Sequence, residues 1–396
     1  MAKRNRMLAF GLTLAFCVTL LTGCWDRTET NDIAFVLTSS IDLEDNGQVR
    51  IAFMLPLPGS MGGASGGGGG TSGSNKSYYI DSEVGDTARE ATSKLQMRLS
   101  RRLFLSHRRT IVIGEKFAKN GIGSMFDIVP RTPESRMTCF LVVTSGKGYD
   151  LLNAEPKFER FPAEVIRELT KSRQSMATST KDIGIALSFG SDPVMAFLDT
   201  VESQVAKQPS QEIQFTGYGQ FKGDRMIGIY KHAEADGLMW LRNQVREHSL
   251  TFPLVPGESG KNLSILVTGG HAAIKPILKG NKVSFDIQLD AKGSVREDLS
   301  EQDLNQSDRI HKVERKFAEQ VKKSVQATIK QMQKQGTDSA QFGLIVWRKY
   351  PNVWNTKLGE KWTELFKEAE FHIKVDAAIT ETGLINQNVI KEGISR

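Results

Sequence analysis

The alternation of hydrophobic and polar residues is clearest near the end of the chain, in "EFHIKVDAAIT" from Glu370 to Thr380. Apolar residues take every second position and polar residues mostly fall between them. A period of two predicts a strand with one buried and one solvated face. The expected inward set is Phe371, Ile373, Val375, Ala377 and Ile379.

A segment with a longer hydrophobic period precedes this strand in the sequence. Apolar residues recur at spacings of three and four, and Gly336 stands where a helix-ending glycine belongs. The stripe is Ile310, Val313, Phe317, Val321, Val325, Ile329 and Met332. We therefore expect one long amphipathic helix. Such a stripe usually packs on a core; a docking face for a partner helix is the alternative.

Two hairpins are predicted ahead of that helix. "IQFTGYGQFKGDRMIGIY" places two strands around the turn Lys222–Arg225, and the helix "ADGLMWLRNQV" follows. "HAAIKPILKGNKVSFDIQLDAKG" alternates on both sides of the turn Lys279–Lys282. Alternating segments joined by short glycine turns are typical of antiparallel pairs.

The N-terminal half mixes strands and helices. We expect strands at 32–43, 47–58, 76–80, 108–114 and 136–146. Helices are expected at 86–103, with Asp86 as N-cap, at 160–175, and at 192–207, with Asp192 as cap and Pro193 in the first turn. These elements follow no regular βαβ order.

The pattern predicts an α+β fold of two to three small mixed domains, with antiparallel hairpins and one long helix in the C-terminal half. We expect a leader at 1–23, an N-terminal domain at 24–208 and a C-terminal domain at 209–396. A further division near residue 300 stays open.

A glycine-rich segment interrupts the N-terminal domain between residues 59 and 75. A phosphate-binding loop needs Gly-Lys-Ser/Thr at the start of a helix. Here Asn75 precedes Lys76, and the strand-like "SYYI" follows. We interpret the segment as a hairpin loop.

The first residues resemble a bacterial lipoprotein signal. Lys3, Arg4 and Arg6 precede an uncharged apolar run from Met7 to Leu21, which is shorter than the ~20 residues of a spanning helix. The run ends in Leu-Thr-Gly-Cys, which resembles a lipobox. The resemblance implies cleavage before Cys24 and diacylglycerol on its sulfur, with a third acyl chain on the new amino group as an option. A retained membrane anchor, or a buried cysteine arising by chance, is the alternative.

Two acyl chains are enough for stable attachment to a bilayer. The first expected strand begins only a few residues after Cys24, so the folded part is expected close to the membrane. The formal charge of +7 falls to +4 when Lys3, Arg4 and Arg6 leave with the leader. The positive sign of this charge favours contact with anionic lipid headgroups. Its small size does not indicate nucleic-acid binding.

Candidate catalytic chemistry is weak in this sequence. Cys17 leaves with the leader, and Cys139 lies in the apolar "MTCFLVV", where we expect a buried small hydrophobe rather than a reactive thiol. The six histidines are scattered, and His107 is read as a structural histidine rather than a base. No metalloprotease, hydrolase or redox motif occurs. We assign no catalytic, cofactor-binding or metal-binding residue and expect no enzyme.

Four stretches together resemble the Ger(x)C family of spore germination C-subunit lipoproteins. They are "GCWDRTETNDIAFV", "RLFLSHRRTIVIGEKFA", "TGYGQFKGDRMIGIYKHAEADGLMWLRN" and "FGLIVWRKYPNVWNTKLGEKWTELFKEAEFHIKVDAAITETGLI". Their order and spacing cover nearly the whole chain. Asp32-Ile33 and the start of "TGYGQF" depart from the usual family pattern, which blurs the subgroup.

The resemblance implies a non-enzymatic subunit of a nutrient germinant receptor. Its partners would be the integral membrane A and B subunits, and the bilayer would hold acylated Cys24 on the outer face of the spore inner membrane. The family fold is three small α/β-type domains in an extended body. Only Cys24 carries a defined chemical role over to this chain.

Two other classes stay open. A solute-binding lipoprotein would deliver a small ligand to a membrane transporter, and should show two doubly wound lobes and a hinge. An exported enzyme is the third class, opposed by the lack of a motif.

Overall fold

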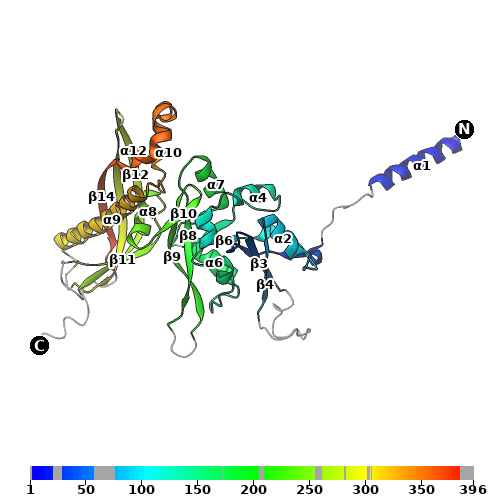
Figure 1. The fold of residues 1–396 in the computed structure, drawn as a ribbon, viewed down its shortest axis with the longest axis horizontal. Helices are drawn as coiled ribbons and strands as arrows, with labels where there is room; N and C mark the ends of the chain where they lie inside the picture. The colour runs from blue at the N-terminus through cyan, green and yellow to red at the C-terminus, as the bar shows by residue number, and fades with distance from the viewer. Residues whose placement is uncertain are drawn as a thin grey trace.

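The computed structural model describes residues 2–20, 29–57, 76–172, 174–204, 209–254, 261–280, 282–300, 304 and 306–383. Within these ranges the body is built on two large sheets, which follow one another along its long axis (Figure 1). Helices cover both faces of the first sheet and one face of the second. The fold class is therefore α+β, as the sequence predicts.

The first sheet has eight strands in the order β10-β9-β8-β7-β6-β2-β3-β4. Their bounds are β2 (Thr38–Leu43), β3 (Val49–Pro56), β4 (Tyr78–Gly85), β6 (Thr110–Gly114), β7 (Phe140–Thr144), β8 (Val194–Glu202), β9 (Gln211–Lys222) and β10 (Arg225–Tyr230). The central strands β2, β6, β7 and β8 run parallel, and antiparallel strands flank them. The central strands are buried on both faces, which explains their nearly continuous apolar runs.

Helices form a layer on each face of this sheet. One face carries α2 (Ala88–Gln96), α3 (Glu115–Asn120), α4 (Met125–Arg131) and α7 (Thr180–Ser188). The other face carries α5 (Gly148–Leu152) and α6 (Pro162–Thr170). Strand alternation separates the two cores: Ile111 and Ile113 face the first layer, whereas Val112 faces the second.

The prediction of a helix at 192–207 is wrong. Residues Val194–Glu202 form β8, which pairs with β7 on one side and β9 on the other. The first five residues of β8 are buried, so this apolar run has no exposed face. Without alternation of apolar and polar residues, its sequence does not distinguish a strand from a helix. Asp192 is not a helix cap; its carboxylate receives hydrogen bonds from two distant loops.

The helix expected at 86–103 is shorter than predicted. It is α2, with Thr87 rather than Asp86 as the N-cap, because the Thr87 side chain accepts the Glu90 N–H. The chain then forms β5 (Arg102–Phe104), which pairs in parallel with β1 (Ile33–Phe35). The expected first strand is thus divided into β1 and β2.

The second sheet has the order β11-β12-β13-β14. Its strands are β11 (His248–Pro253), β12 (Asn262–Lys279), β13 (Lys282–Asp298) and β14 (Glu370–Glu381). The expected hairpin is β12–β13, and β14 alternates as predicted but pairs with β13 in parallel. A parallel neighbour needs a long crossover, which the helices between the two strands provide.

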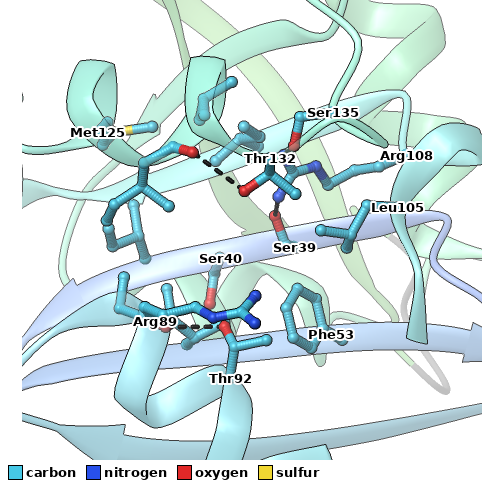
Figure 2. A pocket seen from close by; sticks show the side chains of 16 residues that line it. Ser39, Ser40, Phe53, Arg89, Thr92, Leu105, Arg108, Met125, Thr132 and Ser135 are labelled. Carbon is cyan, nitrogen blue, oxygen red and sulfur yellow. Dashed lines mark hydrogen bonds between the residues drawn. The ribbon is translucent and has the colours of Figure 1, made fainter. Parts of the chain in front are cut away.

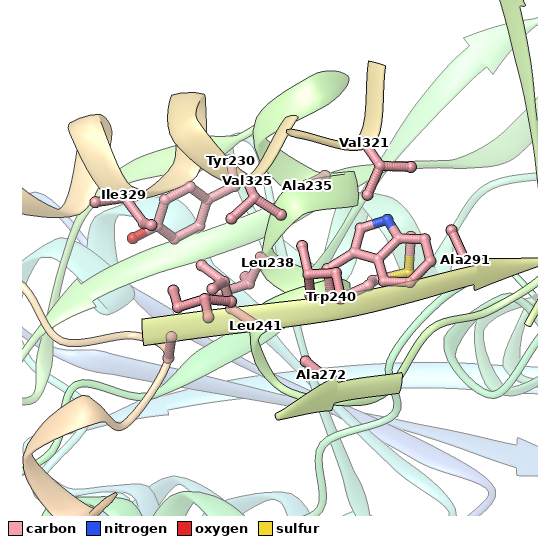
Figure 3. Packing of buried hydrophobic residues seen from close by; sticks show 14 of the residues in the cluster. Tyr230, Ala235, Leu238, Trp240, Leu241, Ala272, Ala291, Val321, Val325 and Ile329 are labelled. Atoms are coloured by element: carbon pink, nitrogen blue, oxygen red, sulfur yellow. The ribbon is translucent and has the colours of Figure 1, made fainter. Parts of the chain in front are cut away.

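Those helices cover one face of the second sheet. They are α9 (Ser307–Gln335), α10 (Phe342–Lys349), α11 (Pro351–Val353) and α12 (Trp362–Lys367), joined there by α8 (Ala233–Leu241). The predicted stripe of α9 is buried at Val313, Phe317 and the apolar residues that follow, and Gly336 ends the helix with φ 64°. Figure 3 shows Val321, Val325 and Ile329 from α9 above Trp240 of α8.

The domain boundary expected at residue 208 falls between β8 and β9, which pair with each other. The first sheet therefore continues to Tyr230, beyond the expected boundary. Tyr218 and Tyr230, from β9 and β10, also belong to the core of the second sheet. The division into domains stays a prediction. The backbone pairing of the first sheet continues past residue 208, because β9 and β10 belong to that sheet.

Residues Ala2–Leu20 form the helix α1. Across the residues that the structure describes, none of the helices combines the length and apolar character needed to cross a bilayer.

Candidate functional site

The predicted lipidation site, Cys24, lies outside the described residues, as does the glycine-rich segment 59–75. Lipidation therefore stays a prediction. The structure does fix where the first strand begins, because β1 starts at Ile33. Ile33 is nine positions after Cys24, with eight residues between them, and nine steps of fully extended chain span about 30 Å. The body is thus tied within that reach of any lipid on Cys24.

The start of the body is held by backbone pairing and aromatic packing. β1 pairs with β5, and the Val36 N–H donates to the carbonyl of Phe104 at 3.1 Å. The Phe35 ring lies 5.8 Å from Phe104 and 4.9 Å from the ring of His107. His107 is therefore a packing residue at this end of the molecule, consistent with a structural role.

A pocket of about 70 Å³ lies near this end, on the face of the first sheet that carries α2 and α4 (Figure 2). Its walls are mainly apolar, with Phe53 from β3, Leu105 from the segment after β5, and Met125 from α4. Polar groups in the lining include the hydroxyls of Ser39, Thr92, Thr132 and Ser135.

The Arg108 guanidinium lines the pocket. Its Nη1 donates to Ser39 Oγ and its Nη2 to Ser135 Oγ, both at 3.2 Å. Burial lowers the pKa of Arg108, and the neighbouring Cys139 side chain partly offsets this effect. Within the described part of the chain, no carboxylate forms an ion pair with Arg108.

Arg89, an exposed residue of α2, also lines this pocket. Figure 2 shows Arg89 and Arg108 entering from different elements. The Thr92 hydroxyl donates to the Ala88 carbonyl at 2.7 Å, so it is satisfied within its own helix. The site thus combines an apolar wall with two cationic groups.

Cys139 is the buried thiol predicted from sequence. It is 2% exposed, and burial raises its pKa to about 11. A thiol with a raised pKa is a poor nucleophile because little thiolate forms. The interpretation as a small core residue is confirmed.

A second polar cluster joins the two sheets at Thr337, Asp338 and Ser339, which follow α9; we call it the 337–339 joint. Gln220 of β9 donates to the Thr337 hydroxyl at 2.8 Å, and Tyr230 of β10 donates to Ser339 at 2.9 Å. The three joint residues are buried. The polar groups of the first sheet therefore fix the loop that begins the crossover of the second.

Asp338 receives all of its side-chain hydrogen bonds from its own half of the molecule. The N–H groups of Phe342 and Gly343 donate at 2.7 and 2.6 Å, and the Trp362 indole donates at 2.9 Å. Burial outweighs these donors and raises the pKa of Asp338 to about 6. The arrangement is a structural clamp rather than a catalytic constellation.

Sequence reasoning singled out neither Arg108 nor Asp338. Arg108 stands in the basic run "HRR", of which the sequence analysis considered only His107. The lack of an ion pair between Arg108 and any described carboxylate is a property of the fold. No group of three or more His, Cys, Asp or Glu side chains suited to a metal occurs among the described residues.

Comparisons with known proteins cover nearly the whole chain. The model named "Spore germination protein N-terminal domain" matches residues 26–198, and "Spore germination B3/ GerAC like, C-terminal" matches residues 216–383. YfkR of Bacillus subtilis (strain 168) is 36% identical over 379 residues, covering 96% of this chain and 97% of YfkR. Spore germination protein KC of the same organism is 22% identical, covering 97% of this chain and 98% of that protein.

The crystal structure of the GerBC protein has a similar fold. Its TM-score is 0.56 at 17% identity, and the match covers 86% of this chain and 96% of that one. The molecule is thus a two-sheet α+β protein of the GerBC type. The chain belongs to the GerAC-like family of spore germination proteins. The resemblance drawn from the sequence is confirmed, and the chain has a role related to germination.

Proposed function

We propose that this chain is the lipid-anchored subunit of a nutrient germinant receptor complex in the spore inner membrane. Acylated Cys24 holds it on the outer face, and it assembles there with the integral membrane A and B subunits. It works by binding these subunits and catalyses no reaction. Family membership carries this proposal, because it covers nearly the whole chain.

Two further observations support the anchor. The signal-like run and the lipobox-like Leu-Thr-Gly-Cys occur in the order that lipoprotein processing requires. The body begins at β1, within about 30 Å of Cys24. A folded body tied so closely is suited to contacting the external loops of membrane subunits.

The test compares Cys24→Ala with Cys17→Ala, a matched control within the apolar run. Both variants are expressed from the native locus in spores. We expect Cys24→Ala to lose inner-membrane attachment and to slow germination, while Cys17→Ala behaves as wild type. Mass spectrometry of the mature N-terminus should find a diacylglycerol on Cys24. An unmodified Cys24, or cleavage elsewhere, contradicts the anchor.

Assembly is tested separately by co-purification from spore membranes in mild detergent. The A and B subunits should be recovered with the wild-type chain. Recovery of a transporter and no A or B subunit would favour the solute-binding alternative. That alternative also predicts two doubly wound lobes, whereas the second sheet here is mainly antiparallel.

A further inference from the structure

Strand β14 forms one edge of the second sheet. It pairs with β13 on its inner side, and within the described residues no strand pairs with its outer side. An edge strand presents N–H and C=O groups to which another extended chain can add, and proline or a bulge often blocks such pairing. No proline occurs between Glu370 and Glu381, and the register with β13 is regular as far as Ile379. This edge therefore has the backbone geometry to accept a further strand.

The outward hydrogen-bonding groups of β14 belong to its odd-numbered residues. The Ile379 N–H donates to Glu314 of α9 at 3.1 Å rather than to β13. Because the direction of these groups alternates along a strand, the N–H groups of residues 371, 373, 375 and 377 point to the same side. Among the described residues, no side chain accepts a hydrogen bond from these four N–H groups. Glu314 thus covers the edge only near Ile379.

The helix-facing side chains of β14 are only half-buried. They pack against the core of the second sheet, and they are Phe371, Ile373, Val375, Ala377 and Ile379. By contrast, Phe285 and Leu289 on the neighbouring strand β13 are both 0% exposed. A further strand with apolar residues at alternate positions would cover the apolar surface that remains.

The solvated face of β14 carries charges in an order that complements a second copy of itself. Lys374 and Asp376 are exposed there, on either side of Val375. Two antiparallel copies related by a two-fold axis at Val375 place Lys374 of each copy opposite Asp376 of the other. Moving the axis by one residue would place Lys374 or Asp376 opposite its own copy, and like charges directly opposite are unfavourable. The charges therefore favour one register.

The same register suits the helix-facing side chains. Val375 would lie opposite Val375 of the second copy, and Ile373 opposite Ala377, so that apolar residues meet apolar residues. The pair of Lys374 and Asp376 would be a non-hydrogen-bonded pair, in which opposing side chains approach most closely. Since helices cover only one face of the second sheet, the helices of both copies would lie on the same face of the joined sheet.

We propose that two copies of this chain associate by antiparallel pairing of β14 about Val375, which joins their second sheets into one. The paired stretch is short, from Ile373 to Ala377, because Glu314 covers the edge at Ile379. An interface of this size is typical of weak and reversible association. The inference does not depend on how the chain is anchored or which subunits it binds.

The experiment is sedimentation velocity of the full-length protein in a density-matched detergent, over a range of micromolar concentrations. Wild type should show a reversible equilibrium between monomer and dimer. Lys374→Glu and Asp376→Lys should each raise the dissociation constant by roughly tenfold or more, because each change replaces two attractive pairs by two repulsive ones. Lys275→Glu is the matched control: Lys275 is exposed on β12, two strands from the edge, and this variant should associate as wild type.

A mixture of the two single variants separates pairing between copies from effects within one chain. Lys374 and Asp376 also form an ion pair within one chain, at 3.1 Å, and each single variant loses it. In an equimolar mixture, a chain with two basic residues meets a chain with two acidic residues, so mixed dimers should form although neither variant pairs well with itself. The double exchange Lys374→Glu with Asp376→Lys should likewise restore self-association. A role within one chain predicts no rescue in the mixture.

Three outcomes would overturn the proposal. The first is a monomer at every concentration of wild type. The second is a dimer that neither single substitution weakens. The third is the absence of mixed dimers when circular dichroism shows both variants to be folded. If one single variant does not fold, the other single variant and the double exchange make the comparison. Loss of membrane attachment in Cys24→Ala would leave these results unchanged, so failure of the two proposals can be told apart.

Discussion

The carboxylate of Asp192 accepts a hydrogen bond from the backbone N–H of Asp338 at 2.6 Å, across 146 residues of sequence. Its other oxygen accepts the Gly223 N–H, also at 2.6 Å. One side chain just before β8 therefore ties the β9–β10 turn to the 337–339 joint. The two sheets are connected by this bridge as well as by the shared core around Tyr218 and Tyr230.

Asp192→Ala should destabilise the protein by about 2–4 kcal/mol, because it leaves two N–H groups without their charged acceptor. The free energy of unfolding from urea denaturation measures this loss. Asp290→Ala, on the exposed face of the second sheet, is the control and should change stability by less than about 0.5 kcal/mol. Equal effects of the two substitutions would show that the bridge is unimportant.

Hydrogen exchange gives a second reading of the same variant. In Asp192→Ala, the amides of Gly223 and Asp338 should both exchange faster, although they are far apart in sequence. Unchanged protection at either amide would mean that the two loops are held by their other contacts.

The stability contributed by Asp338 should depend on pH. Burial raises its pKa to about 6, ahead of the hydrogen bonds from Gly343, Phe342 and Trp362, which lower it. In an unfolded chain the pKa of Asp is about 3.9. The folded state thus binds the proton more tightly, so this contribution is fully present below about pH 4 and is lost as pH rises through 6.

The difference between the folded and unfolded pKa values of Asp338 corresponds to on the order of 3 kcal/mol in the free energy of unfolding. Burial also raises the pKa of the neighbouring Asp192, which adds an effect of the same sign. The comparison is therefore made between wild type and Asp338→Asn, by urea denaturation at pH 4.5 and pH 7. Wild type should gain stability relative to the variant at the lower pH. An equal change in the free energy of unfolding between the two pH values in both proteins would contradict the raised pKa of Asp338.

Adjacent glycines in β12 should respond differently to alanine. A Cβ on Gly270 would overlap the Trp240 ring and lie 2.6 Å from the Asp290 carbonyl, whereas a Cβ on Gly269 has no heavy atom within 4 Å. Gly270→Ala should cost about 1–3 kcal/mol through overpacking of the core beneath α9. Gly269→Ala should be neutral or slightly stabilising. Thermal unfolding distinguishes them, and similar midpoints would show that Trp240 can shift.

Shortening the glycine-rich segment should leave stability nearly unchanged. Its flanking strands β3 and β4 pair up to Pro56 and Tyr78, and the Leu57 N–H donates to the Ser77 carbonyl at 2.8 Å. Replacing residues 62–73 with a short turn should change stability by no more than about 1 kcal/mol, because loop-closure entropy varies slowly with length. A failure to fold would mean that the segment packs against the body.

The sequence predicted most elements where one face is buried and the other is solvated. The stripe of α9 and the alternation of β14 show this, since their periods are visible in the residue order. The failure at β8 has the opposite cause: its first five residues are buried, so the run has no period to read. The Asp-Pro pair before it resembled a helix start, yet Asp192 serves a contact that arises only in the folded chain.

The candidate pocket was less accessible to sequence reasoning than the fold. Ser39, Arg108 and Ser135 come from three separate segments, and only the sheet order brings them together. Local sequence shows that Arg108 is basic but not that it lacks an acidic neighbour. Cys24 shows the opposite situation. The residues that predict its lipidation are its neighbours in the sequence, and the described structure adds only the position of β1.

The parallel pairing of β13 and β14 has a consequence for biosynthesis. The β12–β13 hairpin can form as soon as residue 298 has been made, but the partner of β13 runs from Glu370 to Glu381, near the end of the chain. Until then β13 presents an open hydrogen-bonding edge, from Ser284 to Ser294, to any other extended chain. A premature stop codon before residue 370 would therefore yield a product prone to intermolecular strand pairing and clearance by proteases, rather than a shortened but functional protein.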